Sequence, residues 1–264
     1  MEKLITRGQL LFGIAIAAFG VENFFCAHLG LHVRGVPWFP TNPLFGYLIG
    51  VVLLAAGVSI VTGVAAHLTA ILLGTLFLLY VLVCELPLVI ATPMGLSVRT
   101  VFFEALAIGS SAWTLAAVLP TGGFSSRPWS SALDKALKSG PYLFGISSVV
   151  FGIDHFLILG FIASLVPAWL PGHMFWAYVT GTAFVAAGIS IVIRRMDQLA
   201  AFMLGIMFAL WFFMLHLPRS VSASLSHNPG VQNEWSSAFI AWAMWGGCWI
   251  VAWHARQRRR RTAK

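Results

Sequence analysis

The chain has 264 residues, of which 59% are hydrophobic and 9% are charged. Soluble domains carry roughly 25% charged residues, so this composition excludes a water-soluble globular protein and predicts an integral membrane protein. The net charge of +8 is concentrated at the C-terminus, where the basic run predicts contact with anionic lipid headgroups rather than with nucleic acid.

Eight apolar runs are each long enough to cross a hydrocarbon layer of about 30 Å as a helix. In chain order they cover residues 8–28, 44–64, 67–88, 99–119, 141–162, 173–194, 197–217 and 235–254. They do not alternate polar and apolar residues, so helices are favoured over a β-barrel. Pro43 and Pro141 should open two helices, and Pro87 and Pro218 should end two others. The first run lacks a small-residue cleavage site and continues toward Ala27, so we expect a retained helix and not a cleaved signal peptide.

The two halves of the sequence repeat each other. The segment Phe19-Gly20-Val21-Glu22-Asn23-Phe24 corresponds to Phe151-Gly152-Ile153-Asp154-His155-Phe156, about half the chain further on. Each half holds four predicted helices, an even number, so the halves should be related by an axis along the membrane normal. We therefore predict an all-α, polytopic membrane protein with eight transmembrane helices arranged as two tandem four-helix bundles. Residues 1–119 form the first unit, 120–139 a cytoplasmic linker, and 140–264 the second unit with its basic tail.

Lysine and arginine residues predict the orientation of the chain. Most of them lie at the N-terminus, in the linker, in the turn at Arg194 and Arg195, and in the C-terminal tail. All these segments fall on one side of the predicted topology, whereas the other side holds Arg34, Arg99 and Arg219. The positive-inside rule therefore predicts a multi-pass protein of the cytoplasmic (inner) membrane with both termini in the cytoplasm.

Five acidic residues fall within or beside the predicted helices on the extracytoplasmic side: Glu22, Glu85, Glu104, Asp154 and Glu234. The rise of about 1.5 Å per helical residue places the first four in the outer third of the bilayer. An ionised carboxylate there is costly unless it is paired or hydrated. Glu234 is explained as an ordinary first-turn acid, because a helix N-terminus favours negative charge.

Two interpretations of this layer stay open. In one, the side chains only connect the helices by hydrogen bonds. In the other, they line a polar pocket open to the extracytoplasmic side. The candidate pocket residues are Glu22, Asn23, Glu85, Glu104, Asp154, His155 and His216. We expect the three glutamates to converge in the first half, where they cannot all stay ionised, so one of them should carry a proton near neutral pH.

The three cysteines, Cys26, Cys84 and Cys248, form no Cys-x-x-Cys motif. Cys26 and Cys84 both lie toward the outer surface and could act as redox thiols, although two buried free thiols are the simpler expectation. The spacing of Asp154, His155 and His216 matches no compact set of metal ligands, so no metal is expected.

The repeated Phe-Gly-x-[Glu/Asp]-x-Phe segment resembles the first-helix signature of the DoxX-like family of four-helix integral membrane proteins. The resemblance is carried by residues 20–24 and 152–156 and by the Ala-Ala-Gly elements at 55–57 and 186–188, so each half matches separately. It implies a tandem pair of units in the cytoplasmic membrane. It also implies a role in thiol-linked or quinone-linked redox chemistry, with quinone or another membrane redox subunit as the partner. Any catalytic assignment by resemblance is confined to the segments around Glu22 and Asp154.

Three functions follow from these observations. The first is a DoxX-like membrane subunit in thiol/quinone-linked redox. The second is a carrier that moves a small solute with protons through the buried acid and histidine cluster. The third is a non-catalytic membrane scaffold, so whether the protein is an enzyme is left open by the sequence.

Overall fold

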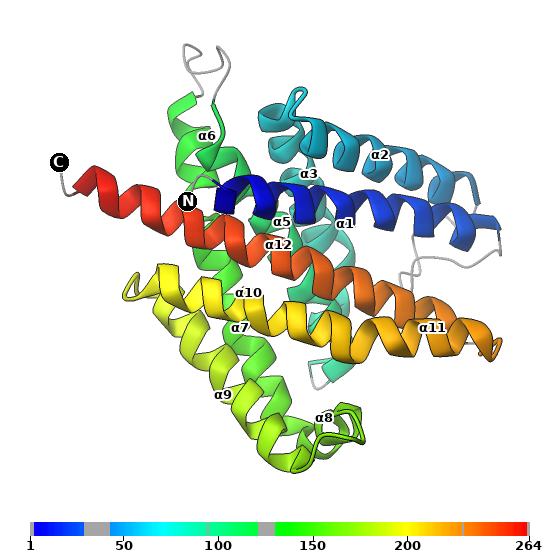
Figure 1. Ribbon diagram of the computed structural model, residues 1–264. Helices are drawn as coiled ribbons and strands as arrows, with labels where there is room; N and C mark the ends of the chain where they lie inside the picture. The colour runs from blue at the N-terminus through cyan, green and yellow to red at the C-terminus, as the bar shows by residue number, and fades with distance from the viewer. Residues whose placement is uncertain (1–2, 29–42, 94, 121–129, 229, 263–264) are drawn as a thin grey trace.

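The computed structural model describes residues 3–28, 43–93, 95–120, 130–228 and 230–262 (Figure 1). These segments are helical, with short connections and no strand among them. Eight of their helices are long and apolar enough to cross a membrane, which confirms the prediction of an all-α, polytopic membrane protein.

The spans follow one another in the predicted order. In the first half they are α1 (Lys3–His28), α2 (Pro43–Thr62), α3 (Ala66–Tyr80) continued by the π-helix η1 (Val81–Glu85) and by α4 (Leu86–Ala91), and α5 (Leu96–Val118). In the second half they are α7 (Gly140–Leu157), α9 (His173–Val192), α10 (Asp197–Trp211) continued by the π-helix η3 (Phe212–His216) and by α11 (Leu217–Leu225), and α12 (Val231–Thr262). Two short helices, α6 (Ser130–Leu137) and α8 (Leu159–Leu165), complete the described elements.

The two four-helix units interlock through their first and last helices. In the first unit α1 packs against α2, and in the second α7 packs against α9. Each of these first helices also packs against the last helix of the other unit, so that α1 contacts α12 and α7 contacts α5. Helices α5 and α12 touch each other at the centre (Figure 1).

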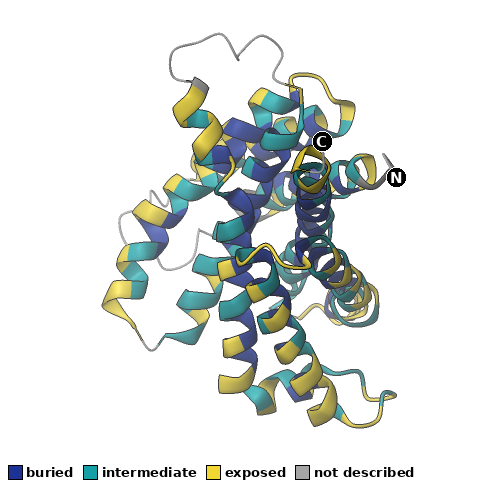
Figure 2. Ribbon diagram, turned by 90° about the vertical axis from the view of Figure 1, so that its left-hand side faces the viewer, coloured by how far each residue is buried: buried dark blue, intermediate teal, exposed yellow. Residues whose placement is uncertain are grey.

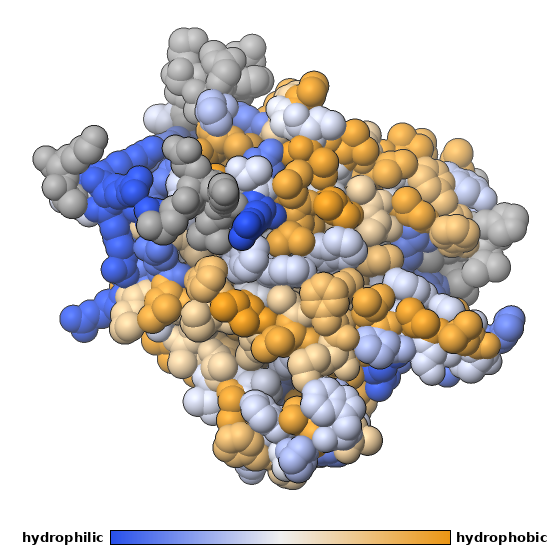
Figure 3. Space-filling model, in the orientation of Figure 1, coloured by the Kyte–Doolittle hydropathy of each residue, from blue (hydrophilic) through white to orange (hydrophobic). Residues whose placement is uncertain are grey.

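The two central helices, α5 and α12, are more deeply buried than the other spans. About 61% of the most apolar window of α5 and 67% of that of α12 is buried, against 28% for α2 and α9. Figure 2 shows the buried residues gathered toward the middle of the molecule. The outer helices expose valine, leucine and phenylalanine side chains instead, which gives the apolar surface seen in Figure 3. Such an exposed apolar surface suits contact with lipid, so the outer helices face the bilayer and the central pair forms the core.

Glycines allow the paired helices to approach closely, and they do so at equivalent positions in the two halves. Gly57 of α2 lies against Gly13 of α1, and Gly188 of α9 lies against Gly145 of α7. A Cβ atom on Gly57 would lie 2.5 Å from the carbonyl oxygen of Gly13, and one on Gly188 would lie 2.6 Å from that of Gly145. Lipid provides no hydrophobic force between helices, so this close packing is a main source of their association.

The contacts between the halves also use small residues. A Cβ atom on Gly246 of α12 would lie 2.5 Å from the backbone nitrogen of Phe12 in α1. In the equivalent crossing, a Cβ atom on Gly140 of α7 would lie 2.7 Å from the carbonyl oxygen of Ser110 in α5. The interlocked arrangement thus rests on the same kind of backbone contact on both sides of the centre.

The third helix of each half continues past the proline that was expected to end it. Pro87 and Pro218 were expected to end their helices, but α4 continues to Ala91 and α11 continues to Leu225. A π-helical turn precedes each proline, in η1 and in η3. Proline lacks an N–H group and its ring crowds the preceding turn, and the wider π turn accommodates both effects. Each helix therefore continues through its proline.

Two other predicted boundaries differ from the structure. The predicted fifth run, 141–162, is divided at Ile158, whose backbone (φ −120°, ψ 37°) is not helical, into α7 and α8. The eighth helix extends beyond the predicted 235–254 to Val231–Thr262, because its basic last turns continue the helix outside the apolar run. Of the predicted linker 120–139, residues 121–129 lie outside the described part of the chain, and the remainder contains α6.

Candidate functional site

Glu22 connects the two halves of the molecule. It lies near the end of α1, is half-buried, and accepts a hydrogen bond from the Oγ hydroxyl of Ser236 in α12. The neighbouring Asn23 donates through Nδ2 to the carbonyl oxygen of Phe19 at 2.8 Å, which is a bond within α1 itself. The contact that fixes Glu22 therefore comes from the last helix of the other unit.

Asp154 occupies the equivalent position in α7 and is also held across the halves. Its side chain forms an ion pair with the guanidinium group of Arg99 in α5. Only 5% of Asp154 is exposed, whereas the Arg99 side chain is partly exposed. A buried charge of this kind is tolerated when it is paired, so the ion pair with Arg99 offsets the cost of burying Asp154.

The two equivalent acids thus have partners of different chemistry. Ser236 offers a hydroxyl group, which donates to a carboxylate and can equally accept from a carboxylic acid. The guanidinium of Arg99 has only donors and carries a permanent positive charge. The repeat therefore gives one acid a neutral hydroxyl partner and the other a cationic partner.

Glu85 and Glu104 complete the acids of the first half. Glu85, at the end of η1, is 2% exposed and accepts a hydrogen bond from the phenolic hydroxyl of Tyr80, one turn earlier. Glu104 in α5 is half-buried and forms no hydrogen bond or ion pair with any residue in the described part of the chain. None of the hydrogen bonds between described residues joins two of the glutamates, and within that part none of the three has a cationic partner.

Glu234 in the second half is paired with an arginine of its own unit. Arg219 of α11 donates from Nε to Glu234 at 2.9 Å and from Nη2 at 2.6 Å, which makes a two-point ion pair with the first turn of α12. His216, at the end of η3, directly precedes α11, the helix that contains Arg219. Glu234 is therefore more than the first-turn acid expected from the sequence, because it also ties α12 to α11.

His155 is enclosed by aromatic rings. Its imidazole is stacked on the indole of Trp211, with ring centroids 5.5 Å apart and planes inclined by 11°, and it also contacts Phe184. Its Nδ1 atom is 2.7 Å from the carbonyl oxygen of Phe151, whereas its Nε2 atom has no hydrogen-bond partner among the described residues. His155 therefore faces α9 and α10, although its neighbour Asp154 pairs with α5.

The cysteines and possible metal ligands are dispersed. Cys84 and Cys248 are buried free thiols in different halves, which for Cys84 agrees with the simpler expectation. The side chain of Cys26 lies outside the described residues, so its role as a redox thiol stays a prediction. In the part of the chain that the structure describes, no three His, Cys, Asp or Glu side chains are grouped closely enough to hold a metal ion.

Several partners in this layer were not identified from the sequence. Tyr80 lies five residues before Glu85, a spacing that a π turn brings onto one face and that an α-helix does not. Ser236 carries no distinguishing signal, since serine is common near helix ends. Arg99 was placed in the same layer by depth, but its pairing with Asp154 depends on which helices are neighbours.

The fold and these contacts define a multi-pass membrane protein with ionisable groups at the contact between two repeats. Residues 144–245 are similar to a family model described as a domain of unknown function (DUF8561). The matched segment begins within α7 and ends within α12, so it covers most of the second half. Comparisons with curated proteins and with solved structures found no match.

Proposed function

We propose that the protein is a membrane carrier that moves a small solute together with protons, and that Glu22, Glu85 and Glu104 bind those protons. One observation carries the proposal: in the described structure these three acids lie within membrane-spanning helices without a cationic partner, whereas Asp154 and Glu234 are each paired with an arginine. A carboxyl group inside a membrane is expensive to retain, and proton pathways are a main reason for retaining one.

The surroundings of these acids support movement. Glu22 lies where α1 meets the other repeat, and Glu85 lies at the π turn that precedes Pro87. Carriers built from repeats bind their substrates at the repeat interface, close to helices whose regular hydrogen bonding is interrupted. Both conditions are met in the first half, so a rearrangement between the halves would change the access of Glu22.

We also place the protein in the cytoplasmic (inner) membrane with both termini in the cytoplasm. The support is the concentration of arginine at the C-terminal end of α12 and in the turn before α10. Glu22 and the π turns would then belong to the extracytoplasmic half of the bilayer.

Proton-coupled transport can be tested in proteoliposomes that contain a trapped pH indicator. A panel of small amines, amino acids and sugars is added outside, and the internal pH is followed. We expect at least one class of solute to drive proton movement through the wild type, and we expect Glu22→Gln to reduce that movement to the level of protein-free liposomes. Glutamine keeps the size and the acceptor oxygen of glutamate but cannot release a proton.

The matched control is Glu234→Gln, which makes the same chemical change in the same layer at an acid that is already paired with Arg219. Its proton movement should stay close to that of the wild type. A folded Glu22→Gln protein with wild-type proton movement would contradict the carrier proposal.

A second candidate function is the quinone-linked redox role that the resemblance to DoxX-like proteins implies. The observation in its favour is the aromatic enclosure of His155 by Trp211 and Phe184, with Nε2 left without a partner among the described residues. A flat ring could lie in such an aromatic environment. Nδ1 carries the proton that bonds the Phe151 carbonyl oxygen, so Nε2 of the neutral imidazole is an acceptor, which could bind the hydroxyl group of a reduced quinone.

The redox candidate is tested by extracting the purified protein with organic solvent and measuring co-purified quinone by mass spectrometry. If quinone binds here, the wild type retains it and a folded His155→Phe protein loses it. Quinone absent from both proteins would remove this candidate and leave the carrier. If Glu22→Gln and His155→Phe changed only the binding of another membrane protein, the scaffold function would be favoured.

A further inference from the structure

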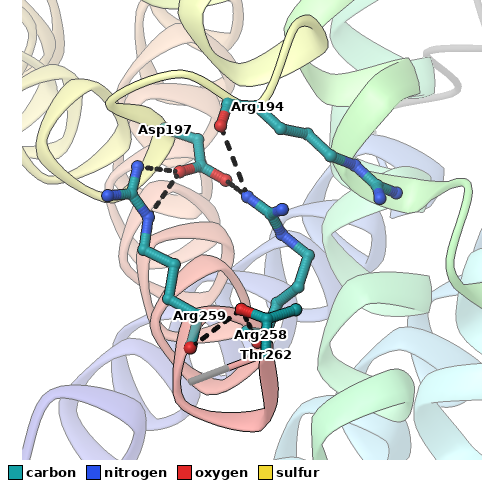
Figure 4. A network of polar contacts seen from close by, with 5 residues as sticks. All are labelled: Arg194, Asp197, Arg258, Arg259 and Thr262. Carbon is teal, nitrogen blue, oxygen red and sulfur yellow. Dashed lines mark hydrogen bonds and ion pairs between the residues drawn. The ribbon is translucent and has the colours of Figure 1, made fainter.

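A cluster of arginines lies at the end of the molecule where the C-terminus is found. Arg258 of α12 donates from Nη2 to Oδ2 of Asp197 at 2.6 Å, and Arg259 donates from Nη2 to Oδ1 at 2.7 Å (Figure 4). Asp197 begins α10 and is only 4% exposed. These ion pairs of Arg258 and Arg259 with Asp197, here called the Asp197 clamp, join the end of α12 to the start of α10.

The turn before Asp197 has a counterpart in the first half that contains no charge. Arg194 and Met196 adopt left-handed backbone conformations with φ of 58° and 55°. Gly63 and Ala65 do the same in the equivalent turn, with φ of 79° and 53°. The shape of the turn is thus a property of the repeat, and its first left-handed position is occupied by glycine in one half and by arginine in the other. Since glycine adopts this conformation readily and arginine does not, the fold does not require an arginine there.

This end of the molecule holds more arginines than the two that pair with Asp197. Arg195, Arg260 and Arg261 are exposed and form no ion pair with any residue that the structure describes. Arg258 also donates from Nη2 to the carbonyl oxygen of Arg194 at 3.5 Å, so the turn and the end of α12 lie close together. Figure 3 shows the corresponding hydrophilic surface at the end of the molecule where the C-terminus lies.

An apolar border adjoins these cations. Ile193, Met196 and Leu199 are exposed on the turn and on the first turn of α10. Helix α12 has 32 residues and is therefore about 48 Å long, which exceeds a hydrocarbon layer of about 30 Å. Its basic last turns must therefore lie in the headgroup region, next to side chains that face acyl chains.

We propose that this basic end, formed by Arg195, Arg260 and Arg261 with the apolar border of Ile193 and Met196, is a binding surface for anionic phospholipids. The free guanidinium groups bind the headgroup phosphate, and the exposed apolar side chains contact the acyl chains. Charge complementarity and the adjoining apolar border favour a lipid over a nucleic acid, which has no acyl chain. The inference stands independently of the proposed carrier function.

Native mass spectrometry of the full chain in detergent tests the proposal, with phosphatidylglycerol or phosphatidylcholine added at equal concentration. The wild type should retain phosphatidylglycerol in preference to phosphatidylcholine. Arg260→Gln/Arg261→Gln should weaken that retention by roughly fivefold for each cation removed. These two residues take no part in the Asp197 clamp, so the variant should keep the fold.

The matched control is Lys135→Gln/Lys138→Gln, which removes the same number of exposed cations from α6 and the residue that follows it. We expect this control to retain phosphatidylglycerol as the wild type does. Equal retention of the two lipids by the wild type, an unchanged Arg260→Gln/Arg261→Gln protein, or an equal loss in the lysine control would each overturn the proposal. Binding of a single-stranded RNA at physiological salt without any preference for phosphatidylglycerol would overturn it in favour of a nucleic-acid partner.

Discussion

Asp154→Asn is expected to lower the free energy of unfolding by about 3 kcal/mol, because it leaves the guanidinium group of Arg99 without its counter-ion. Removing one partner of a fully buried ion pair lowers the free energy of unfolding by about 3–5 kcal/mol. Arg99 is partly exposed, so we expect a value at the lower end of this range. The loss can be measured by equilibrium unfolding in mixed detergent micelles, followed by tryptophan fluorescence.

Two further variants show whether the uncompensated charge is the cause. Arg99→Met/Asp154→Leu removes both charges and should recover most of the lost stability, since an apolar pair of similar volume is often as stable as a buried ion pair. Glu22→Gln changes the equivalent acid, whose partner is the Ser236 hydroxyl, and should cost less than about 1 kcal/mol. A stability of Asp154→Asn equal to that of Glu22→Gln would show that the ion pair with Arg99 does not hold the halves together.

Gly57→Ala is expected to lower the free energy of unfolding by about 2–3 kcal/mol through overpacking between α1 and α2. The added methyl group would lie 2.5 Å from the carbonyl oxygen of Gly13 and would also meet the backbone of Ala17. Backbone atoms cannot move aside as a flexible side chain can, so the two helices must separate. Thermal unfolding in detergent should show a lower midpoint, and Gly188→Ala should behave in the same way in the second half.

Gly160→Ala is the matched control for this effect. Gly160 lies in a helix, α8, and a Cβ atom there would meet no atom within 4 Å. Its substitution should change the stability by no more than about 0.5 kcal/mol. If Gly57→Ala and Gly160→Ala gave the same midpoint, close contact between α1 and α2 would not be a source of stability.

These variants separate the two roles of charge inside the membrane. Asp154 is expected to affect stability first, because its ion pair with Arg99 joins the two units. Glu22 is expected to affect proton movement first, because its hydroxyl partner suits both protonation states. Equivalent positions of the repeat would thus serve structure in one half and transport in the other.

The eight spans, the helical class and the repeat were all predictable from the sequence. Hydropathy is a local property, and a helix that must satisfy its own backbone in lipid needs about 20 apolar residues whatever surrounds it. The depth of each acid followed from the rise per residue, so Glu22, Glu85 and Asp154 could be assigned to one layer. The repeat also aligned Pro87 with Pro218. Proline usually ends a helix, so the sequence predicted a helix end at both positions. That prediction was wrong, because a π turn before each proline allows the helix to continue.

The partners of the acids were decided by the tertiary structure alone. Depth along a helix says nothing about which helix is the neighbour, and a tandem repeat suggests contacts within each half. The structure instead holds Glu22 by Ser236 and Asp154 by Arg99, each from the other half. The physical reason is the close packing of small residues, which brings α1 against α12 and α7 against α5 and so brings each acid to its partner.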